Sequence, residues 1–563
     1  MTRSTTQGSG TDSEAPKKRW GAFEPLRERT FRVIWSASLL SNFGQLILGV
    51  GAAWEMTRLT TAASMVALVQ TALMLPLMLV AVPAGAIADM FDRRRIALTG
   101  LTFATLCAAT LTVIASLGLT TPWLLFCFCS LIGGGVALYG PAWQASVSEQ
   151  VEPEQLPAAV ALSSVSYNIA RSFGPAVGGM IVLAAGATAA FAVNAVFYLP
   201  LLIAFFLWRR RHIPSRLPPE RIDRAIIAGA RYAMHSPPIR IVMIRAFAFG
   251  LAAASSAALT PLVARDLLKG DASTYGLLLG ATGVGAVVGA LVLSEARSRL
   301  KAEHAVRLCA IVGGVMVLVI GLSHSVLLTG AVMMVAGAAY MLNIALLNVG
   351  VQLSAPRWVT ARAIAWFQSS LTGGIALGAW MWGHLATDWG LSNALIASGI
   401  ALILTPLIGL VLPMPPVSAA GVEMVDIANE PEVALAITAR SGPIAIEIEY
   451  CVDPAAARQF YDVMLKLQRA RLRNGAFDWS LSRDIADPAL WMERYHCPTW
   501  GDYLRLRSRF THSDRELQTL ADAFHTAGAG VRVRRRLERP FGSVRWRAES
   551  PDPTRDPINL YTP

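Results

Sequence analysis

Charged side chains are scarce in this chain. They make up 15% of its 563 residues, whereas soluble domains usually carry about a quarter. The deficit is concentrated before residue 413, where long apolar runs follow one another. This excludes an ordinary soluble protein for that part, which we expect to lie in a lipid bilayer. After residue 413 the composition returns to that of a soluble domain.

Signatures of several other protein classes are also missing. The six cysteines form no C-x-x-C pair, so neither a disulfide framework nor a metal site is expected. No phosphate-binding P-loop sequence occurs, so we expect no ATP hydrolysis and no cofactor. The net charge of +12 arises entirely before residue 413. There it sets the topology and meets lipid head groups, and it does not indicate a nucleic-acid partner.

The apolar runs have the length of membrane-spanning helices. About twenty residues allow an α-helix to cross ~30 Å of hydrocarbon, and helices are expected because the backbone must bond to itself in lipid. Twelve such segments cover 33–54, 63–86, 97–117, 123–145, 158–183, 189–208, 239–263, 274–295, 304–322, 327–350, 362–387 and 393–412. The sequence therefore predicts an all-α polytopic membrane protein with twelve transmembrane helices.

The distribution of Lys and Arg predicts the orientation of these helices. Connections that would face the cytosol carry 24 of them, and the opposite connections carry three, namely Arg58, Arg265 and Lys269. Because cytosolic loops are enriched in Lys and Arg, we expect both termini in the cytoplasm and the protein in a bacterial inner membrane. The first 20 residues are polar and basic, so no cleavable signal peptide is expected.

The loop between the second and third segments carries the most informative motif. It reads GAIADMFDRRR and contains Gly85, Asp89, Asp92, Arg93, Arg94 and Arg95. The pattern resembles the gating loop of major facilitator superfamily transporters. That resemblance implies that the acid Asp89 pairs across the interface of two halves in one conformation. The alternative is that the arginines only follow the positive-inside bias, which leaves the glycine and the acid unexplained.

An internal repeat divides the segments into two sixes. An offset of 204 residues places Gly85 on Gly289, Arg93 on Arg297, Arg95 on Arg299, Gly174 on Gly378 and Gly179 on Gly383. Two parallel six-helix halves with substrate bound between them are typical of major facilitator transporters. The second copy lacks both acids, since Leu293 and Ala296 stand at the positions of Asp89 and Asp92. The sequence thus predicts an asymmetric gate.

The fifth segment carries a second motif, NIARSFGPAVGG. It contains Gly174, Pro175, Gly178 and Gly179, and it resembles the antiporter motif found mostly in exporters of the superfamily. Glycines permit close approach of helices, and a proline frees a carbonyl. Ordinary packing glycines are the alternative interpretation. The Arg that precedes a Gly in the fourth helix of many proton-driven exporters is absent from residues 131–145, so its coupling role is not carried over.

Two arginines lie inside predicted spans. Arg171 lies roughly 20 Å deep, and no acidic residue stands at mid-depth in any segment. A buried membrane charge is a functional hypothesis by default. Arg171 is expected either to have a structural role, bonding to backbone carbonyls near Pro175, or to bind an anionic substrate. Arg245 lies closer to the helix end and is expected to snorkel. The other pathway candidates, each more often an interhelical hydrogen bond, are Asn42, Gln45, Gln144, Asn168, Asn343 and Gln368.

The residues after 413 predict a cytosolic α+β domain. Strand and helix patterns across 444–538 follow the β-α-β-β-α-β order of the ferredoxin-like fold. The domain resembles antibiotic-biosynthesis monooxygenases, which implies dimerisation. The chain as a whole resembles the enterobactin-exporter-like branch, the transmembrane secretion effectors, through Thr511, His512, Asp514, Arg515, Ala523, Phe524 and His525. An aromatic pocket is conceivable at Trp479, Trp491, Trp500 and His512, but no nucleophile–base pair or metal-ligand spacing occurs there.

These patterns predict a secondary transporter and not an enzyme. Its expected parts are a polar tail (1–30), a first half (31–208), a basic linker (209–238), a second half (239–412), a linker (413–440), the ferredoxin-like domain (441–540) and a tail (541–563). We expect export of a siderophore, drug-like compound or metabolite by alternating access, with protons as the coupling ion implied by the resemblance. The alternatives are an importer of the same fold and a membrane-anchored monooxygenase-like enzyme.

Overall fold

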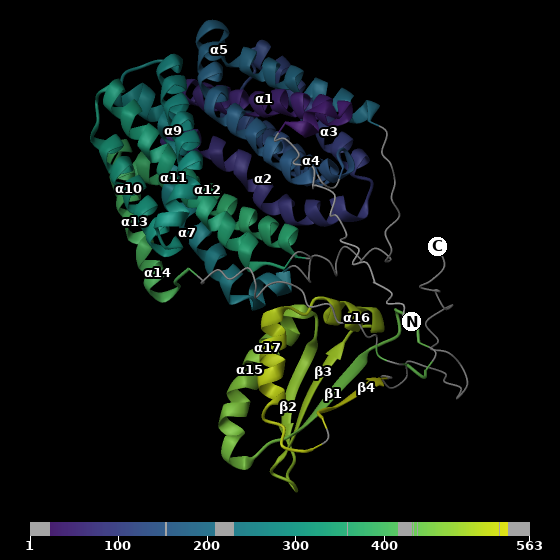
Figure 1. Ribbon diagram of the computed structural model, residues 1–563. Helices are drawn as coiled ribbons and strands as arrows, with labels where there is room; N and C mark the ends of the chain where they lie inside the picture. The colour runs from purple at the N-terminus through teal and green to yellow at the C-terminus, as the bar shows by residue number, and fades with distance from the viewer. Residues whose placement is uncertain are drawn as a thin grey trace, which may run out of the picture.

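The computed structural model shows a bundle of long helices followed by a small α/β domain (Figure 1). It describes residues 23–152, 155–208, 230–356, 359–414, 431, 433–435, 437–528 and 530–538. The bundle contains α1 (Arg29–Leu59), α2 (Ala63–Met90), α3 (Arg93–Ser116), α4 (Pro122–Ser146), α5 (Leu156–Leu207), α7 (Pro237–Ala258), α8 (Thr260–Leu262), α9 (Ala272–Arg299), α10 (Ala302–Leu322), α11 (Val326–Ser354), α12 (Thr360–Trp389), α13 (Leu391–Leu404) and α14 (Ile408–Val411).

The predicted polytopic helical membrane protein is confirmed. Among the described residues, ten helices are long and apolar enough to cross a membrane. One of them, α5, covers two predicted segments and is interrupted by Gly186, whose φ of +77° is a conformation open to glycine. The 30-residue α12 is not one of the ten, because its sequence is richer in polar residues.

The helices form two halves, α1–α5 and α7–α14, which meet where α2 packs on α12 and α5 packs on α9. A Cβ on Gly179 of α5 would lie 2.5 Å from the Cα of Gly276 on α9. A Cβ on Gly383 of α12 would lie 2.5 Å from the Cβ of Ala67 on α2. Gly179 and Gly383 occupy equivalent positions of the 204-residue repeat, so the two interfaces follow the predicted internal symmetry.

The two ends of the bundle are distinguished by the segment 209–229 between the halves. The linker side is the end of the bundle at which α5 ends and α7 begins. The far side is the opposite end, at which α1 ends and α2 begins. Hydrogen bonds join the halves across the far side. Arg265 donates to the carbonyl of Thr57, and the amide of Ser64 donates to Thr387. This structure is therefore closed on the far side.

The tail domain has the predicted order of elements. Its strands are β1 (Ile444–Cys451), β2 (Phe477–Arg483), β3 (Leu490–Cys497) and β4 (Arg532–Leu537), and its helices are α15 (Ala457–Asn474), α16 (Trp500–Ser508) and α17 (His512–Asp522). The sheet is antiparallel in the order β2-β3-β1-β4, which is the order that ferredoxin-like connectivity produces. Figure 1 shows α15 and α17 on one face of it.

A buried ion pair lies in the core of the tail domain. Arg471 of α15 donates to Glu493 of β3 at 3.1 Å, and both side chains are almost fully buried. Burial opposes the charge on Arg471, but Glu493, Tyr495 and Tyr450 together outweigh burial and raise the pKa of the guanidinium. Trp479 donates to the same carboxylate at 2.9 Å. Trp500 packs on Tyr503 with ring centroids 5.2 Å apart. Both tryptophans thus act as packing residues of the domain.

The residues that carry the resemblance in the tail have structural roles. Thr511 and Asp514 form a capping box at the start of α17, each accepting from the backbone N–H of the other. The Nδ1 of His525 accepts from the backbone N–H of Cys451 at 3.0 Å, which ties the end of α17 to β1. The motif therefore fixes the position of α17, and its His525 is engaged with backbone.

Candidate functional site

Arg171 reaches from α5 of the first half to α11 of the second, at mid-depth in the bundle. Its guanidinium carbon lies 5.7 Å from the centre of the Tyr340 ring, and one terminal nitrogen lies 3.8 Å from the sulfur of Met341. The Tyr340 ring packs in turn on Phe249 of α7, with centroids 5.5 Å apart. A cation with an aromatic wall thus lies where the two halves meet.

The charge of Arg171 is not neutralised by a carboxylate among the described residues. A ring face and a thioether are weak partners, since a cation–π contact contributes only about 0.5–2 kcal/mol. The guanidinium is half-buried, so it keeps donors available. A cation placed in this way at membrane depth can hold an anion between the halves.

The predicted pathway amides do not bond to Arg171 in the part of the chain that the structure describes. Asn42 donates to the Ser166 hydroxyl at 3.5 Å and joins α1 to α5 within the first half. Gln144 and Gln368 are exposed, and Gln45 is half-buried. The side chain of Asn168 lies outside the described residues.

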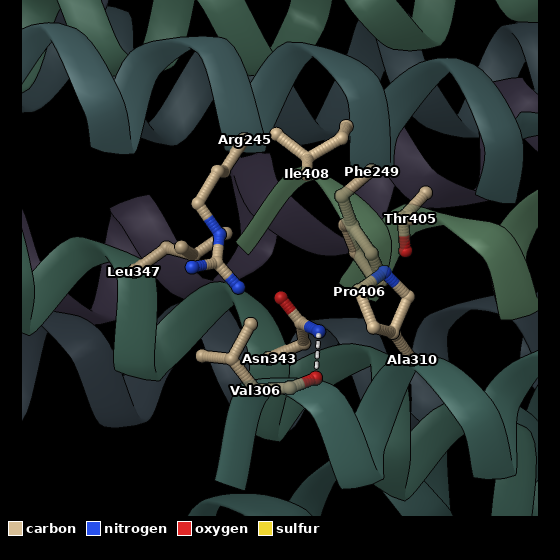
Figure 2. Close-up of a pocket in the computed structure, with 9 residues that line it drawn as sticks. All are labelled: Arg245, Phe249, Val306, Ala310, Asn343, Leu347, Thr405, Pro406 and Ile408. Carbon is tan, nitrogen blue, oxygen red and sulfur yellow. Dashed lines mark hydrogen bonds between the residues drawn. The ribbon is translucent and has the colours of Figure 1, made fainter. Parts of the chain in front are cut away.

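A pocket lies inside the second half, beside Arg245 (Figure 2). Asn343 donates to the carbonyl of Val306 at 3.2 Å, and its buried Oδ1, which faces Arg245 in Figure 2, finds no partner among the described residues. The free space is on the scale of one water molecule, which needs polar partners such as these. The pocket is too small for an organic substrate.

Arg245 is buried and paired, so the prediction that it snorkels is wrong. It is 5% exposed and contacts Glu303 at the start of α10 through bonds of 2.5 and 3.2 Å. Glu303 also accepts from Arg307 at 2.7 Å and from the backbone N–H of Met414 at 2.8 Å. Arg307 donates to the carbonyl of Gly409. This cluster ties α7 and α10 to the end of α14, where cations suit the helix dipole.

Removal of the Glu303 carboxylate is expected to destabilise the second half strongly. Glu303→Ala leaves Arg245 buried without a counter-charge, which costs on the order of 3 kcal/mol. The measurement is the thermal unfolding of the purified protein in detergent. Glu295→Ala is the matched control, because Glu295 pairs with Arg299 at an exposed site and such pairs contribute about 0.5 kcal/mol or less. Equal losses in the two variants would contradict a structural role for the Arg245 cluster.

The arginines of the loop at 85–95 cap helices of their own half. Arg93 donates to the carbonyl of Ala145 at 2.8 Å and to Glu149 at 3.0 Å. Arg94 donates to the carbonyl of Phe205 at 2.9 Å. These contacts place cations at the carbonyl ends of α4 and α5, where the helix dipole favours them. The basic cluster therefore holds the linker-side ends of the first half together.

The structure describes the side-chain contacts of Asp92, one of the two acids of this loop, but not those of Asp89. Asp92 is the N-cap of α3 and accepts from the backbone N–H of Arg95 at 3.1 Å. Gly85 and Asp89 lie at the end of α2. The position of the Asp89 side chain is outside the described part, so its pairing stays a prediction. In the second copy Arg297 is exposed, which differs from the bonded Arg93.

The glycines of the fifth-helix motif serve two interfaces. Cβ atoms on Gly174 and Gly178 would lie 3.1 and 3.2 Å from atoms of α1, inside the first half. Gly179 faces Gly276 of the second half, and the carbonyl of the buried Pro175 lies beside the same glycine. The motif thus combines packing within a half with a close approach between the halves.

Sequence reasoning missed the groups that surround the two arginines. Tyr340 and Met341 stand in an apolar segment without any pattern that would mark them. Glu303 carried a usable signal, because it lies four residues before Arg307, the spacing of a helical ion pair. Arg265 was counted only as a residue of an outer loop, although it bonds to the other half.

This architecture defines a membrane transporter of the major facilitator type, with two packed helical halves and a charged residue between them. The chain belongs to the transmembrane secretion effector family, whose model matches residues 20–541. The matched residues include both halves and the tail domain.

Two relatives with named transport functions are similar to this chain at low identity. The staphyloferrin A transporter of Staphylococcus aureus (strain NCTC 8325 / PS 47) is 26% identical over 47% of this chain, which spans 66% of the relative's length. The multidrug efflux pump Tap of Mycolicibacterium fortuitum is 24% identical over 68% of this chain and 95% of its own.

Solved structures share the fold of the helical part. A bacterial homolog of the human lysosomal transporter Spinster matches with a TM-score of 0.55 and 13% identity, over 69% of this chain and 97% of its own. The nucleoside transporter NupG matches with a TM-score of 0.54 and 11% identity, over 68% of this chain and 99% of its own.

Proposed function

We propose that this protein is a secondary active transporter that exports a small organic anion from the cytoplasm by alternating access. The observation that carries the proposal is Arg171, a cation without a carboxylate partner among the described residues, at mid-depth between the halves. In this fold substrate binds near the midplane at that interface. The substrate class is a siderophore, drug-like compound or metabolite with at least one negative charge.

Export is favoured over import by two observations. The fifth-helix motif resembles that of exporters, and its Gly179 forms a close contact between the halves. One distant relative carries the name of an efflux pump and another that of a siderophore transporter. We place both termini and the linker side in the cytosol of a bacterial inner membrane. The chain then crosses twelve times, because α5 crosses twice and α12 once.

Inverted membrane vesicles test the direction of transport. Candidate cargo is first found by comparing metabolites inside and outside cells that lack or overproduce the protein. An exporter accumulates that compound inside inverted vesicles, whose cytosolic face points outward. Uptake into whole cells together with no accumulation in inverted vesicles would instead establish an importer. The proposed coupling ion is the proton, so collapse of the pH gradient is expected to stop the accumulation.

The loop at 85–95 is proposed to act as an asymmetric gate through Asp89. Asp89→Asn is expected to remove most transport, about tenfold or more, because a neutral amide loses the charge-assisted bond or helix-dipole contact of a carboxylate. Arg297→Gln in the second copy is expected to reduce transport much less, since Arg297 is exposed and no acid stands at the positions equivalent to Asp89 and Asp92. Vesicle transport is compared at equal amounts of inserted protein. Equal losses in the two variants would refute the asymmetry.

The tail domain is proposed to be a non-catalytic module of the transporter. Its buried charges Arg471 and Glu493 are paired with each other and hold the fold, and its resemblance to antibiotic-biosynthesis monooxygenases implies pairing of two copies. Mass measurement of the purified full chain tests the dimer. An enzyme would be indicated if the tail oxidised quinol-like compounds while Arg171→Ala left the cellular phenotype intact.

A further inference from the structure

The end of α1 receives a hydrogen bond from the other half. α1 ends at Leu59, so the carbonyls of its last turn lack partners within the helix. The N–H of Thr60 satisfies the carbonyl of Met56. The next carbonyl, that of Thr57, accepts from a terminal nitrogen of Arg265 at 2.5 Å. A cation is favourable at this end of a helix because of the helix dipole.

Arg265 is held in place by an unusual turn. Residues Val263–Leu267 form a π-helix, in which the N–H of Leu268 bonds to the carbonyl of Val263 at 3.0 Å. Neighbouring side chains do not face each other on a regular α-helix, but here Asp266 binds its neighbour Arg265 through two bonds of 2.6 and 3.0 Å. The carboxylate orients the guanidinium and leaves one terminal nitrogen for Thr57. Such π-bulges are frequent at functional sites.

The start of α2 is also capped from the other half. Its N-cap position holds Ala62, whose side chain cannot accept a hydrogen bond. The N–H of Ser64, one of the unpaired donors of the first turn, donates to the Thr387 hydroxyl of α12 at 3.0 Å. Thr387 itself donates to the carbonyl of Gly383. Thr387 thus performs the task of an N-cap residue, although it belongs to a different helix and a different half.

The helix on the other side of the interface does not share this dependence. α9 carries its own N-cap, Asp271, which accepts from the backbone N–H groups of Ser273 and Thr274 at 3.0 and 3.1 Å. Its cap therefore survives any movement of the halves. The caps of α1 and α2 are lost when the far side opens.

We propose that Arg265 and Thr387 form a far-side latch, in which caps supplied across the interface favour the conformation closed on that side. The proposal rests on the alternating access proposed above. Opening of the far side leaves the carbonyl of Thr57 and the amide of Ser64 to water, so each cap shifts the balance toward the closed state. The stacked rings of Trp54 and Tyr275, 6.2 Å apart, connect the same two halves through α1 and α9.

Distances between spin labels at Thr61 and Lys269 test the latch. Both residues are exposed on the far side, in different halves, and the labels are placed on a background without the native cysteines. Thr387→Val and Arg265→Gln are each expected to raise the ratio of open to closed protein about fivefold, the effect of losing one helix cap. The label distances are measured without substrate and without transport. The latch proposal can therefore be refuted while the exporter proposal stands, and the exporter proposal can be refuted while the latch stands.

Two matched variants serve as controls. Thr372→Val removes a hydroxyl that bonds within α12, and Arg58→Gln removes a far-side cation that pairs within α1. Neither is expected to change the distances. The latch is overturned if Thr387→Val and Arg265→Gln leave the distances unchanged, or if the controls shift them equally.

A cap supplied within α2 provides the decisive comparison. Ala62→Asp places an N-cap acceptor on α2 itself, where it satisfies the first turn in both conformations. In this background Thr387→Val is expected to have no further effect on the distances, whereas Arg265→Gln keeps its fivefold effect. An undiminished effect of Thr387→Val beside Asp at position 62 would show that Thr387 acts through packing and not as a cap.

Discussion

Replacement of Arg171 by glutamine is expected to lower transport by about ten- to a hundredfold while leaving the stability of the protein nearly unchanged. The transport loss follows because a charge-assisted hydrogen bond to an anion contributes about 1.5–3 kcal/mol. Stability is retained because Arg171 contacts only the Tyr340 ring and the Met341 sulfur, and no described carboxylate depends on it. Initial rates in inverted vesicles and the thermal unfolding temperature measure the two effects.

The kinetic pattern distinguishes substrate binding from a general disturbance. If Arg171 binds the substrate anion, removal of its charge in Arg171→Gln raises KM. Arg171→Lys keeps the charge but not the planar guanidinium, so it is expected to retain part of the affinity. Arg58→Gln removes an exposed arginine and is expected to leave KM unchanged. Normal KM and rate in Arg171→Gln would remove the basis of the anion proposal, and a large loss of stability would make Arg171 a structural residue.

Replacement of Gly179 by alanine is the second change expected to stop most transport. The added Cβ would lie 2.5 Å from the Cα of Gly276 and 2.9 Å from the carbonyl of Ala272, so backbone must move between the halves. Overpacking of this kind costs about 1–3 kcal/mol, which penalises the conformation closed on the far side roughly 5- to 100-fold. Transport in vesicles is expected to fall by a similar factor, since the cycle must pass through that conformation.

Gly140→Ala is the matched control for this substitution. A Cβ on Gly140 would meet no atom within 4 Å, although the residue lies in a transmembrane helix as Gly179 does. Its transport is expected to equal that of the unaltered protein. Full transport in Gly179→Ala would show that the halves need not approach at this point.

The internal repeat shows which structural features a sequence pattern could predict. The offset of 204 residues was read from a few glycines and arginines, and the structure places Gly179 and Gly383 at equivalent contacts between the halves. The glycines predict these contacts because close approach of helices requires small residues. The equivalent arginines of the repeat make different contacts, since Arg93 caps α4 and Arg297 is exposed. A residue type at an equivalent position does not specify its partner.

Arg171 and Arg245 show where the sequence was insufficient. Both are cations inside apolar segments, and depth alone suggested a functional Arg171 and a snorkelling Arg245. Only the fold brings Glu303, more than fifty residues away in the chain, to Arg245. The same folding leaves Arg171 beside Tyr340 and Met341. Whether a buried arginine is structural or a candidate for binding substrate therefore depends on which distant segments of the chain the fold places beside it.

The sequence by itself determined the membrane class, the helical halves and the succession of strands and helices along the tail domain. These follow from local physics, because hydrophobic length sets a span and residue periodicity sets a strand or helix. Tertiary structure alone decided which charges are neutralised and which helix ends are capped by which half. Those outcomes depend on contacts between segments far apart in the chain, such as Arg265 with Thr57 and Thr387 with Ser64, and no local pattern encodes them.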